Sequence, residues 1–116
     1  MIERMLNNPK LKHVCFDISW DETAKYLVKT SEAVEVTADL INRYPERFLF
    51  GTDTVAPQTQ EQYLEPYKIY APLFAKLTPE TKLLLLKGNY ERIFDKARQQ
   101  VRAWEADNVL NSTADR

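Results

Sequence analysis

Two short apolar segments, separated by a stretch with helical spacing, constrain the fold of this chain more than any other feature. Residues 12–19 read Lys-His-Val-Cys-Phe-Asp-Ile-Ser, and residues 47–53 read Arg-Phe-Leu-Phe-Gly-Thr-Asp. The first alternates, with Val14, Phe16 and Ile18 on one face, and the second is a continuous apolar run, as in parallel strands covered on both faces. We therefore predict an α/β fold in which two parallel strands are joined by a right-handed β-α-β crossover.

About five helices are expected around these strands, because apolar residues elsewhere recur at three- and four-residue intervals. Asp21 is expected to cap the first helix, and Thr59 to cap a later one. Pro66 and Pro72 are expected to kink or split the helix that contains them, and Gly88 to end the next. The expected helices span residues 21–29, 31–44, 59–74, 78–88 and 89–104, after a partial helix at 1–8.

Length and composition limit the classes of function. The chain has 116 residues, 16 Lys and Arg against 17 Asp and Glu, one His and one Cys. This composition suits one domain, and a net charge of −1 gives no basic surface for nucleic acid or an anionic membrane. A lone Cys excludes an internal disulfide, and the longest apolar run, Leu83–Leu86, is far too short to span a bilayer. We expect a cytoplasmic protein without nucleic-acid or membrane partners.

Three segments resemble the amidohydrolase superfamily, in its amidohydrolase-related branch. Residues 45–53, Pro-Glu-Arg-Phe-Leu-Phe-Gly-Thr-Asp, resemble the last barrel strand of that family, which ends in an active-site aspartate. Residues 13–20, His-Val-Cys-Phe-Asp-Ile-Ser-Trp, resemble the preceding strand. Leu-Thr-Pro-Glu at 77–80, followed by Lys-Gly-Asn-Tyr-Glu-Arg-Ile-Phe at 87–94, resembles the helical end of the family's fold. The three segments follow one another in the family's order, and the similarity covers roughly residues 1–105.

The resemblance implies a (β/α)₈ TIM barrel, of which this chain supplies the C-terminal portion. A complete barrel needs about 250 residues, so 116 residues provide only its last two strands and their helices. We expect residues 1–105 to form this part of the barrel and residues 106–116 to form a polar tail. Two strands alone have unpaired edges and solvent-exposed apolar faces, which favours self-association or pairing with a complementary chain.

The function that the resemblance implies is metal-dependent hydrolysis of a C–N or C–O bond in a small-molecule substrate. Asp53 would contact a divalent metal, with zinc as the expected ion, and share a proton with the hydrolytic water. The family's His-x-His pair and its further histidines are missing. His13 begins a strand, whereas barrel sites lie at the C-terminal ends of strands. Only Asp53 can be carried over, so we expect the chain alone to bind no metal and to be inactive.

Further residues near the expected strand ends are candidates for the substrate pocket. Trp20 would supply an aromatic wall, and Asp21 an orienting hydrogen bond. Each has a structural alternative: a packed Trp, a helix cap for Asp21, a turn cap for Asp53, and local turn bonds for the threonines. We expect Cys15 to be a buried small apolar residue rather than a nucleophile. The complete set of pocket candidates beside Asp53 is Ser19, Trp20, Asp21, Thr52 and Thr54.

Three alternatives to the hydrolase remain open. The same superfamily branch contains decarboxylases with a similar site. A non-catalytic fragment that acts by pairing with another chain would have the same sequence features. A small α-rich binding module, whose helices cover the two strands by themselves, is the third.

Overall fold

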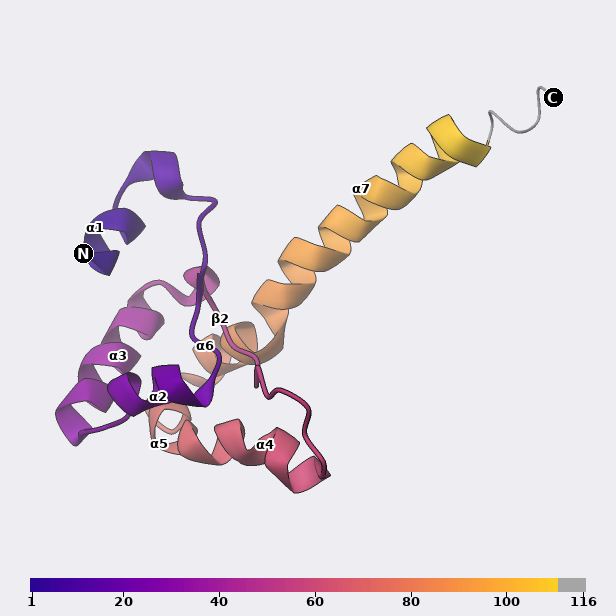
Figure 1. Cartoon of the computed structure of the whole chain (residues 1–116). Coiled ribbons are helices and arrows are strands. Elements are labelled where there is room, and N and C mark those ends of the chain that lie inside the picture. Colours follow the sequence, from indigo (N-terminus) through magenta and orange to yellow (C-terminus); the bar gives the residue numbers. More distant parts are fainter. Residues whose placement is uncertain (111–116) are drawn as a thin grey trace.

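Two short parallel strands, β1 (Phe16–Asp17) and β2 (Phe48–Leu49), lie side by side among helices in the computed structural model, which describes residues 1–110 (Figure 1). Phe16 is opposite Phe48, and the amide of Ile18 donates a hydrogen bond of 3.0 Å to the carbonyl of Leu49. The predicted parallel pair is confirmed, and the described chain is a mostly helical structure that is compatible with the α/β class.

Both strands are shorter than the predicted spans of 12–19 and 47–53. Among the described residues the ladder has two facing residue pairs, and each strand has a neighbour on one side only. Arg47, expected to begin the second strand, belongs instead to a 3₁₀ turn at Pro45–Arg47, where Pro45 fixes the backbone angle φ.

Helices make up most of the described chain. Helix α3 (Ser31–Arg43) begins after Thr30, whose hydroxyl accepts a hydrogen bond of 3.1 Å from the amide of Ala33. Thr59 and Thr78 cap α4 (Gln60–Ile69) and α6 (Pro79–Leu83) in the same way. The helices are α1 (Ile2–Leu6), α2 (Asp21–Leu27), α3 (Ser31–Arg43), α4 (Gln60–Ile69), α5 (Ala71–Phe74), α6 (Pro79–Leu83) and α7 (Lys96–Glu105). A 3₁₀ turn spans Pro9–Leu11, and wide π turns span Leu84–Gly88, Glu91–Asp95 and Ala106–Leu110.

The two prolines of the predicted 59–74 helix act differently. Pro66 lies inside α4 without ending it, whereas Pro72 stands in the first turn of α5, just after the break at Tyr70. A proline has no amide hydrogen to donate to the helical hydrogen bonds. Pro72 stands in the first turn of α5, where that hydrogen would have no partner in the helix.

The prediction that Gly88 ends a helix is wrong. The chain stays helical from Pro79 through the π turn at Leu84–Gly88 and onward, and Gly88 does not have a positive φ. A Cβ at this position would lie 3.0 Å from Cδ2 of Leu84, so glycine here provides space for a side chain on the preceding turn.

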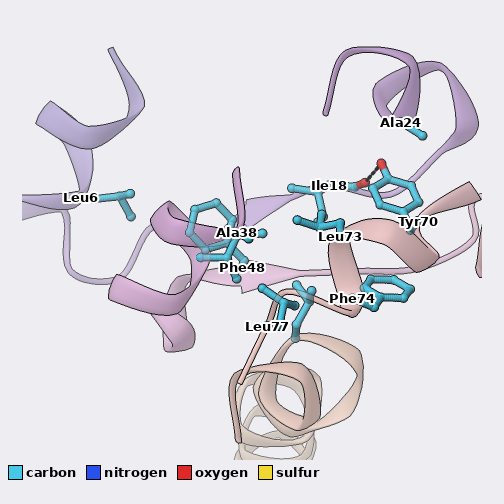
Figure 2. Close-up of a cluster of buried hydrophobic side chains, with 11 residues drawn as sticks. Leu6, Ile18, Ala24, Ala38, Phe48, Tyr70, Leu73, Phe74 and Leu77 are labelled. Carbon is cyan, nitrogen blue, oxygen red and sulfur yellow. Dashed lines mark hydrogen bonds between the residues drawn. The ribbon is translucent and has the colours of Figure 1, made fainter. Parts of the chain in front are cut away.

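The apolar core lies around the strands, between α3 and α5. Figure 2 shows the hydroxyl of Tyr70 turned toward the carbonyl of Ile18, to which it donates a hydrogen bond. Phe50 packs edge-on against two other rings: its ring centroid lies 5.0 Å from that of Tyr70 and 5.1 Å from that of Phe74. The buried core residues are Leu6, Ile18, Ala24, Ala38, Ile41, Phe48, Tyr70, Leu73, Phe74, Leu77 and Leu85.

Arg47 ties the start of β2 to the chain that leads into β1. Its Nε donates to the carbonyl of Val14 at 2.7 Å, and Nη2 donates to the carbonyl of Leu11 at 2.7 Å. A guanidinium carries several donors in a rigid fork, so one side chain satisfies two carbonyls that have no partner in a sheet.

Asn89 holds the other side of β2. It is fully buried, and its Nδ2 donates to the carbonyls of Pro45 and Phe48 at 2.7 and 2.9 Å. Arg92, one turn later, donates to the carbonyl of Glu46 at 2.7 Å. The Gly-Asn-x-x-Arg segment therefore anchors the C-terminal helical region to the backbone of β2.

Beyond Asn89 the C-terminal helix points away from the rest of the protein (Figure 1). No residue of α7 is buried. Residues 106–110 of the predicted polar tail continue the helix as a π turn, and residues 111–116 lie outside the described chain. Within residues 1–110, no helix has the length and apolar character needed to cross a membrane.

Candidate functional site

A pocket of about 580 Å³ opens at the C-terminal ends of both strands. One side is formed by Trp20 and Asp21 after β1, another by residues that follow β2, and the third by α4. Of the six candidate site residues, the structure brings five into this pocket wall. These five are Trp20, Asp21, Thr52, Asp53 and Thr54.

Ser19, the sixth candidate, does not line the pocket but connects the two strand ends. Its Oγ accepts a hydrogen bond of 2.7 Å from the amide of Gly51 and donates to the carboxylate of Asp17. The same carboxylate oxygen accepts from the amide of Ser19 at 2.7 Å. A Cβ on Gly51 would lie 3.2 Å from this Oγ, so glycine permits the close approach. Ser19 therefore fixes the separation between the two loops that carry the site.

Trp20 and Asp53 both have left-handed backbone conformations. Trp20 has a φ of 84° and Asp53 a φ of 48°, and each stands just beyond the end of a strand. For residues with a Cβ this region is costly by about 1–2 kcal/mol, although Asp tolerates it better than most. Strained backbone of this kind is concentrated at functional sites, and here two such residues line one pocket.

The hydroxyl-bearing residues next to Asp53 differ in burial. Thr52 is 8% exposed and Thr54 is partly buried, while Asp53 between them is open to solvent. Oγ1 of Thr54 is buried and has no hydrogen-bond partner within residues 1–110. A buried hydroxyl without a partner is destabilising, and this one belongs to a residue that lines the pocket.

Asp21 does not cap α2 as predicted. Trp20 occupies the N-cap position without a side-chain hydrogen bond, and Asp21 is the first residue inside the helix. An acidic side chain in the first turn still interacts favourably with the positive end of the helix dipole. Asp21 is an exposed residue and lines the pocket.

Tyr70 does not line the pocket, but its hydroxyl lies next to the backbone of Trp20, which does. Besides its bond to Ile18, its hydroxyl lies 3.2 Å from the carbonyl of Trp20, the residue with the strained backbone. Burial raises the pKa of Tyr70 to about 12, and the nearby carboxylates of Asp17 and Asp21 act in the same direction. The phenol is thus kept neutral, as it must be to donate to a carbonyl.

Two acidic residues of α4, Glu61 and Glu65, also line the pocket, although neither was predicted as a site residue. Both pair with Lys68, at 3.1 and 3.2 Å, and these hydrogen bonds raise the pKa of that lysine. Their four-residue spacing, which places both on one helix face, was the signal available in the sequence.

The carboxylates of the pocket do not fit a metal centre by themselves. Within residues 1–110, no three His, Cys, Asp or Glu side chains lie close enough together to hold a metal ion. A zinc site requires three or four such ligands. His13, the one histidine, is exposed in the loop before β1 and does not line the pocket. Cys15, which is partly buried, directs its thiol to the carbonyl of Glu46 at 3.9 Å.

Comparisons of the chain with protein-family models, with curated proteins and with solved structures find no match.

Proposed function

We propose that this chain is the C-terminal part of an amidohydrolase-like, metal-dependent hydrolase with a TIM-barrel fold, and that Asp53 is its catalytic carboxylate. The observation that carries the proposal is the pocket at the carboxyl ends of two parallel strands. Barrel enzymes assemble their sites at this end of the strands, and the five residues gathered there include the aspartate that the resemblance singles out.

The residues of this chain supply proton transfer and orientation. The exposed carboxylate of Asp53 accepts a proton from the water that attacks a carbonyl carbon, and returns it to the leaving nitrogen or oxygen. Thr52 and Thr54 lie on either side of Asp53 in sequence, and both residues line the same pocket. Trp20, about half exposed, forms an apolar wall for a small organic substrate.

The remaining ligands of a divalent metal must come from polypeptide outside residues 1–110. We propose that they are the histidines of the other barrel strands, with Asp53 as the ligand from this chain. The outer edges of β1 and β2 have no strand neighbour in the described chain, which is where further strands would add. A cytoplasmic setting suits Cys15, the single cysteine of the sequence.

The test measures hydrolysis by the whole product of the reading frame that contains this chain, with Zn²⁺ or Mn²⁺ added. Esters, lactones and amides serve as substrates, and the Asp53→Asn variant is compared with Asp95→Asn, which alters an exposed aspartate outside the pocket. We expect Asp53→Asn to lower kcat/KM by at least about a hundredfold and Asp95→Asn to leave it unchanged. Full turnover by the Asp53→Asn enzyme would contradict the proposal.

Two outcomes of the same assay separate the alternatives. Release of CO₂ from carboxylic acids, lost in Asp53→Asn, would assign the decarboxylase chemistry of the same superfamily. The isolated 116-residue chain is expected to show no turnover. Turnover by that chain alone would refute the claim that essential ligands lie elsewhere.

A non-catalytic role is the second candidate, and the unpaired strand edges favour it. In that case the chain acts by pairing with a complementary chain, and the pocket has no catalytic duty. Absence of turnover in the whole reading-frame product, together with a stable complex containing a second polypeptide, would support this candidate over the hydrolase.

A further inference from the structure

Tyr70 is a buried residue whose hydroxyl contacts the backbone of the pocket wall. It stands at the break between α4 and α5, and its hydroxyl donates to the carbonyl of Ile18 (Figure 2). The same hydroxyl lies 3.2 Å from the carbonyl of Trp20. Both ends of the short segment that leaves β1 therefore converge on one hydroxyl.

The ring of Tyr70 is held firmly by its own surroundings. It stacks on Phe74 with ring centroids 5.8 Å apart, and Phe50 packs edge-on against it at 5.0 Å. The amide of Tyr70 donates to the carbonyl of Pro66 at 2.9 Å, and the carbonyl of Tyr70 accepts from the amide of Phe74 at 3.0 Å. The hydroxyl is therefore a fixed point beside the backbone of Trp20.

Trp20 has a backbone conformation that residues with a Cβ rarely adopt, with a φ of 84°. Its side chain is 48% exposed at the pocket, and within residues 1–110 the indole forms no hydrogen bond and no ring contact. The place of the indole therefore depends on the backbone of residue 20. The carbonyl of Trp20 accepts from the amide of Ala24 at 3.2 Å at the start of α2, and Tyr70 contacts it from outside that helix.

We propose that Tyr70 is a positioning residue, whose hydroxyl holds Trp20 in the positive-φ conformation and so fixes the indole on the pocket wall for substrate binding. The part that concerns substrate rests on the proposed hydrolase function, whereas the conformational part does not. Tyr70 does not line the pocket, so it acts through Trp20. An apolar wall binds the ground state and the transition state alike, so its displacement changes KM rather than kcat.

The first test measures the backbone conformation of residue 20 in the 116-residue chain by NMR. A residue with a positive φ has its amide and α hydrogens close together, which gives a strong nuclear Overhauser effect between them. Tyr70→Phe keeps the ring and removes the hydroxyl, and we expect it to lower this effect at Trp20 at least about twofold. Asp53, which has a φ of 48° and no hydrogen bond to Tyr70, is the internal reference and should keep its strong effect.

Tyr44→Phe is the matched control for this test. It also removes a hydrogen-bonded hydroxyl, whose partner is Oδ1 of Asn7 at 2.6 Å, and Tyr44 does not line the pocket. It should leave the effects at Trp20 and Asp53 unchanged. An effect at Trp20 that Tyr70→Phe leaves intact would overturn the proposal. Equal losses at Trp20 and Asp53, or an unfolded Tyr70→Phe chain, would show a general structural role and would also overturn it.

The second test separates substrate binding from turnover in the whole product of the reading frame, with the same substrates and added metal. Tyr70→Phe should raise KM at least about fivefold and leave kcat within about twofold. In the Trp20→Ala background the same change should have no further effect on KM, because the indole that Tyr70 positions is gone. A fall in kcat at unchanged KM, or an equal rise in KM with and without the indole, would refute the positioning role.

The two tests distinguish a failure of this inference from a failure of the hydrolase proposal. Absence of turnover in the original reading-frame product would contradict the hydrolase function and with it the effect on KM. The NMR measurement needs no activity, so it still supports or overturns the claim that Tyr70 holds Trp20.

Discussion

The hydroxyl oxygen of Ser19 accepts a hydrogen bond of 2.7 Å from the amide of Gly51, and so joins the chain just after β1 to the chain just after β2. These are the two segments that carry Trp20 and Asp53 into the pocket. The sheet itself has only two facing residue pairs, so this bond extends the connection between the strands to the level of the site.

Ser19→Ala tests this connection. Removal of the hydroxyl leaves the amide of Gly51 without its partner, and we expect the free energy of unfolding to fall by about 1–2 kcal/mol. Urea unfolding measures the change. Ser31→Ala, the same substitution at the exposed first residue of α3, should cost less than about 0.5 kcal/mol. Equal effects of the two substitutions would contradict the role given to Ser19.

Asn89→Ala tests the anchor of β2. The change leaves the carbonyls of Pro45 and Phe48 without this donor and creates a cavity at a buried position, so a loss of about 3 kcal/mol is expected. Thermal or urea unfolding gives the value. The matched control is Asn108→Ala, since Asn108 is exposed and bonds only within its own helix at Trp104. A loss below about 1 kcal/mol for Asn89→Ala would show that the anchor is dispensable.

Tyr70→Phe is expected to show a pH-dependent effect. The pKa of Tyr70 is raised to about 12 in the folded chain, against about 10 in an unfolded one, so folding favours the neutral phenol. This contribution to stability is complete below pH 10 and is lost as the pH rises toward 12. The stability difference between the original chain and Tyr70→Phe should therefore be constant from pH 7 to 9 and narrow between pH 10 and 12.

Urea unfolding at each pH measures this difference, with Tyr26→Phe as the control. Tyr26 is largely exposed, so its substitution should have little effect at any pH. A Tyr70→Phe effect that stays constant up to pH 12 would contradict the buried, neutral phenol.

Asp53→Gly distinguishes a site residue from a structural turn cap. The carboxylate has no hydrogen bond in the described chain, and the backbone φ of 48° suits glycine. We therefore expect Asp53→Gly to raise the free energy of unfolding by up to about 1 kcal/mol, and Asp53→Ala to lower it by a similar amount. Denaturant unfolding of the two variants provides the comparison. A marked loss of stability in Asp53→Gly would indicate a turn cap.

The sequence was sufficient to predict the parallel strands. Apolar runs such as Phe48–Phe50 end in turn-forming residues, and parallel strands place their carboxyl ends at one edge. For this reason Trp20 and Asp53, which are distant in sequence, line the same pocket.

Other features depend on tertiary contacts that local patterns do not contain. Trp20 occupies the cap of α2 with a positive φ, which no local preference predicts, and its carbonyl lies 3.2 Å from the hydroxyl of Tyr70, in another part of the chain. Gly88 follows the pattern of a helix end but provides space for Leu84. Ser19 was selected as a pocket residue, yet its partner lies 32 positions away in the second strand loop.

The central claim, that this chain completes a barrel begun elsewhere in the same gene, is tested most directly by reading the coding DNA upstream of the Met1 codon in frame. We predict an open frame of roughly 200 codons or more, enough for the six barrel strands and helices that this chain lacks. It should encode a His-x-His pair after an apolar strand. A stop codon close upstream of Met1, with no such segment in frame, would contradict the claim.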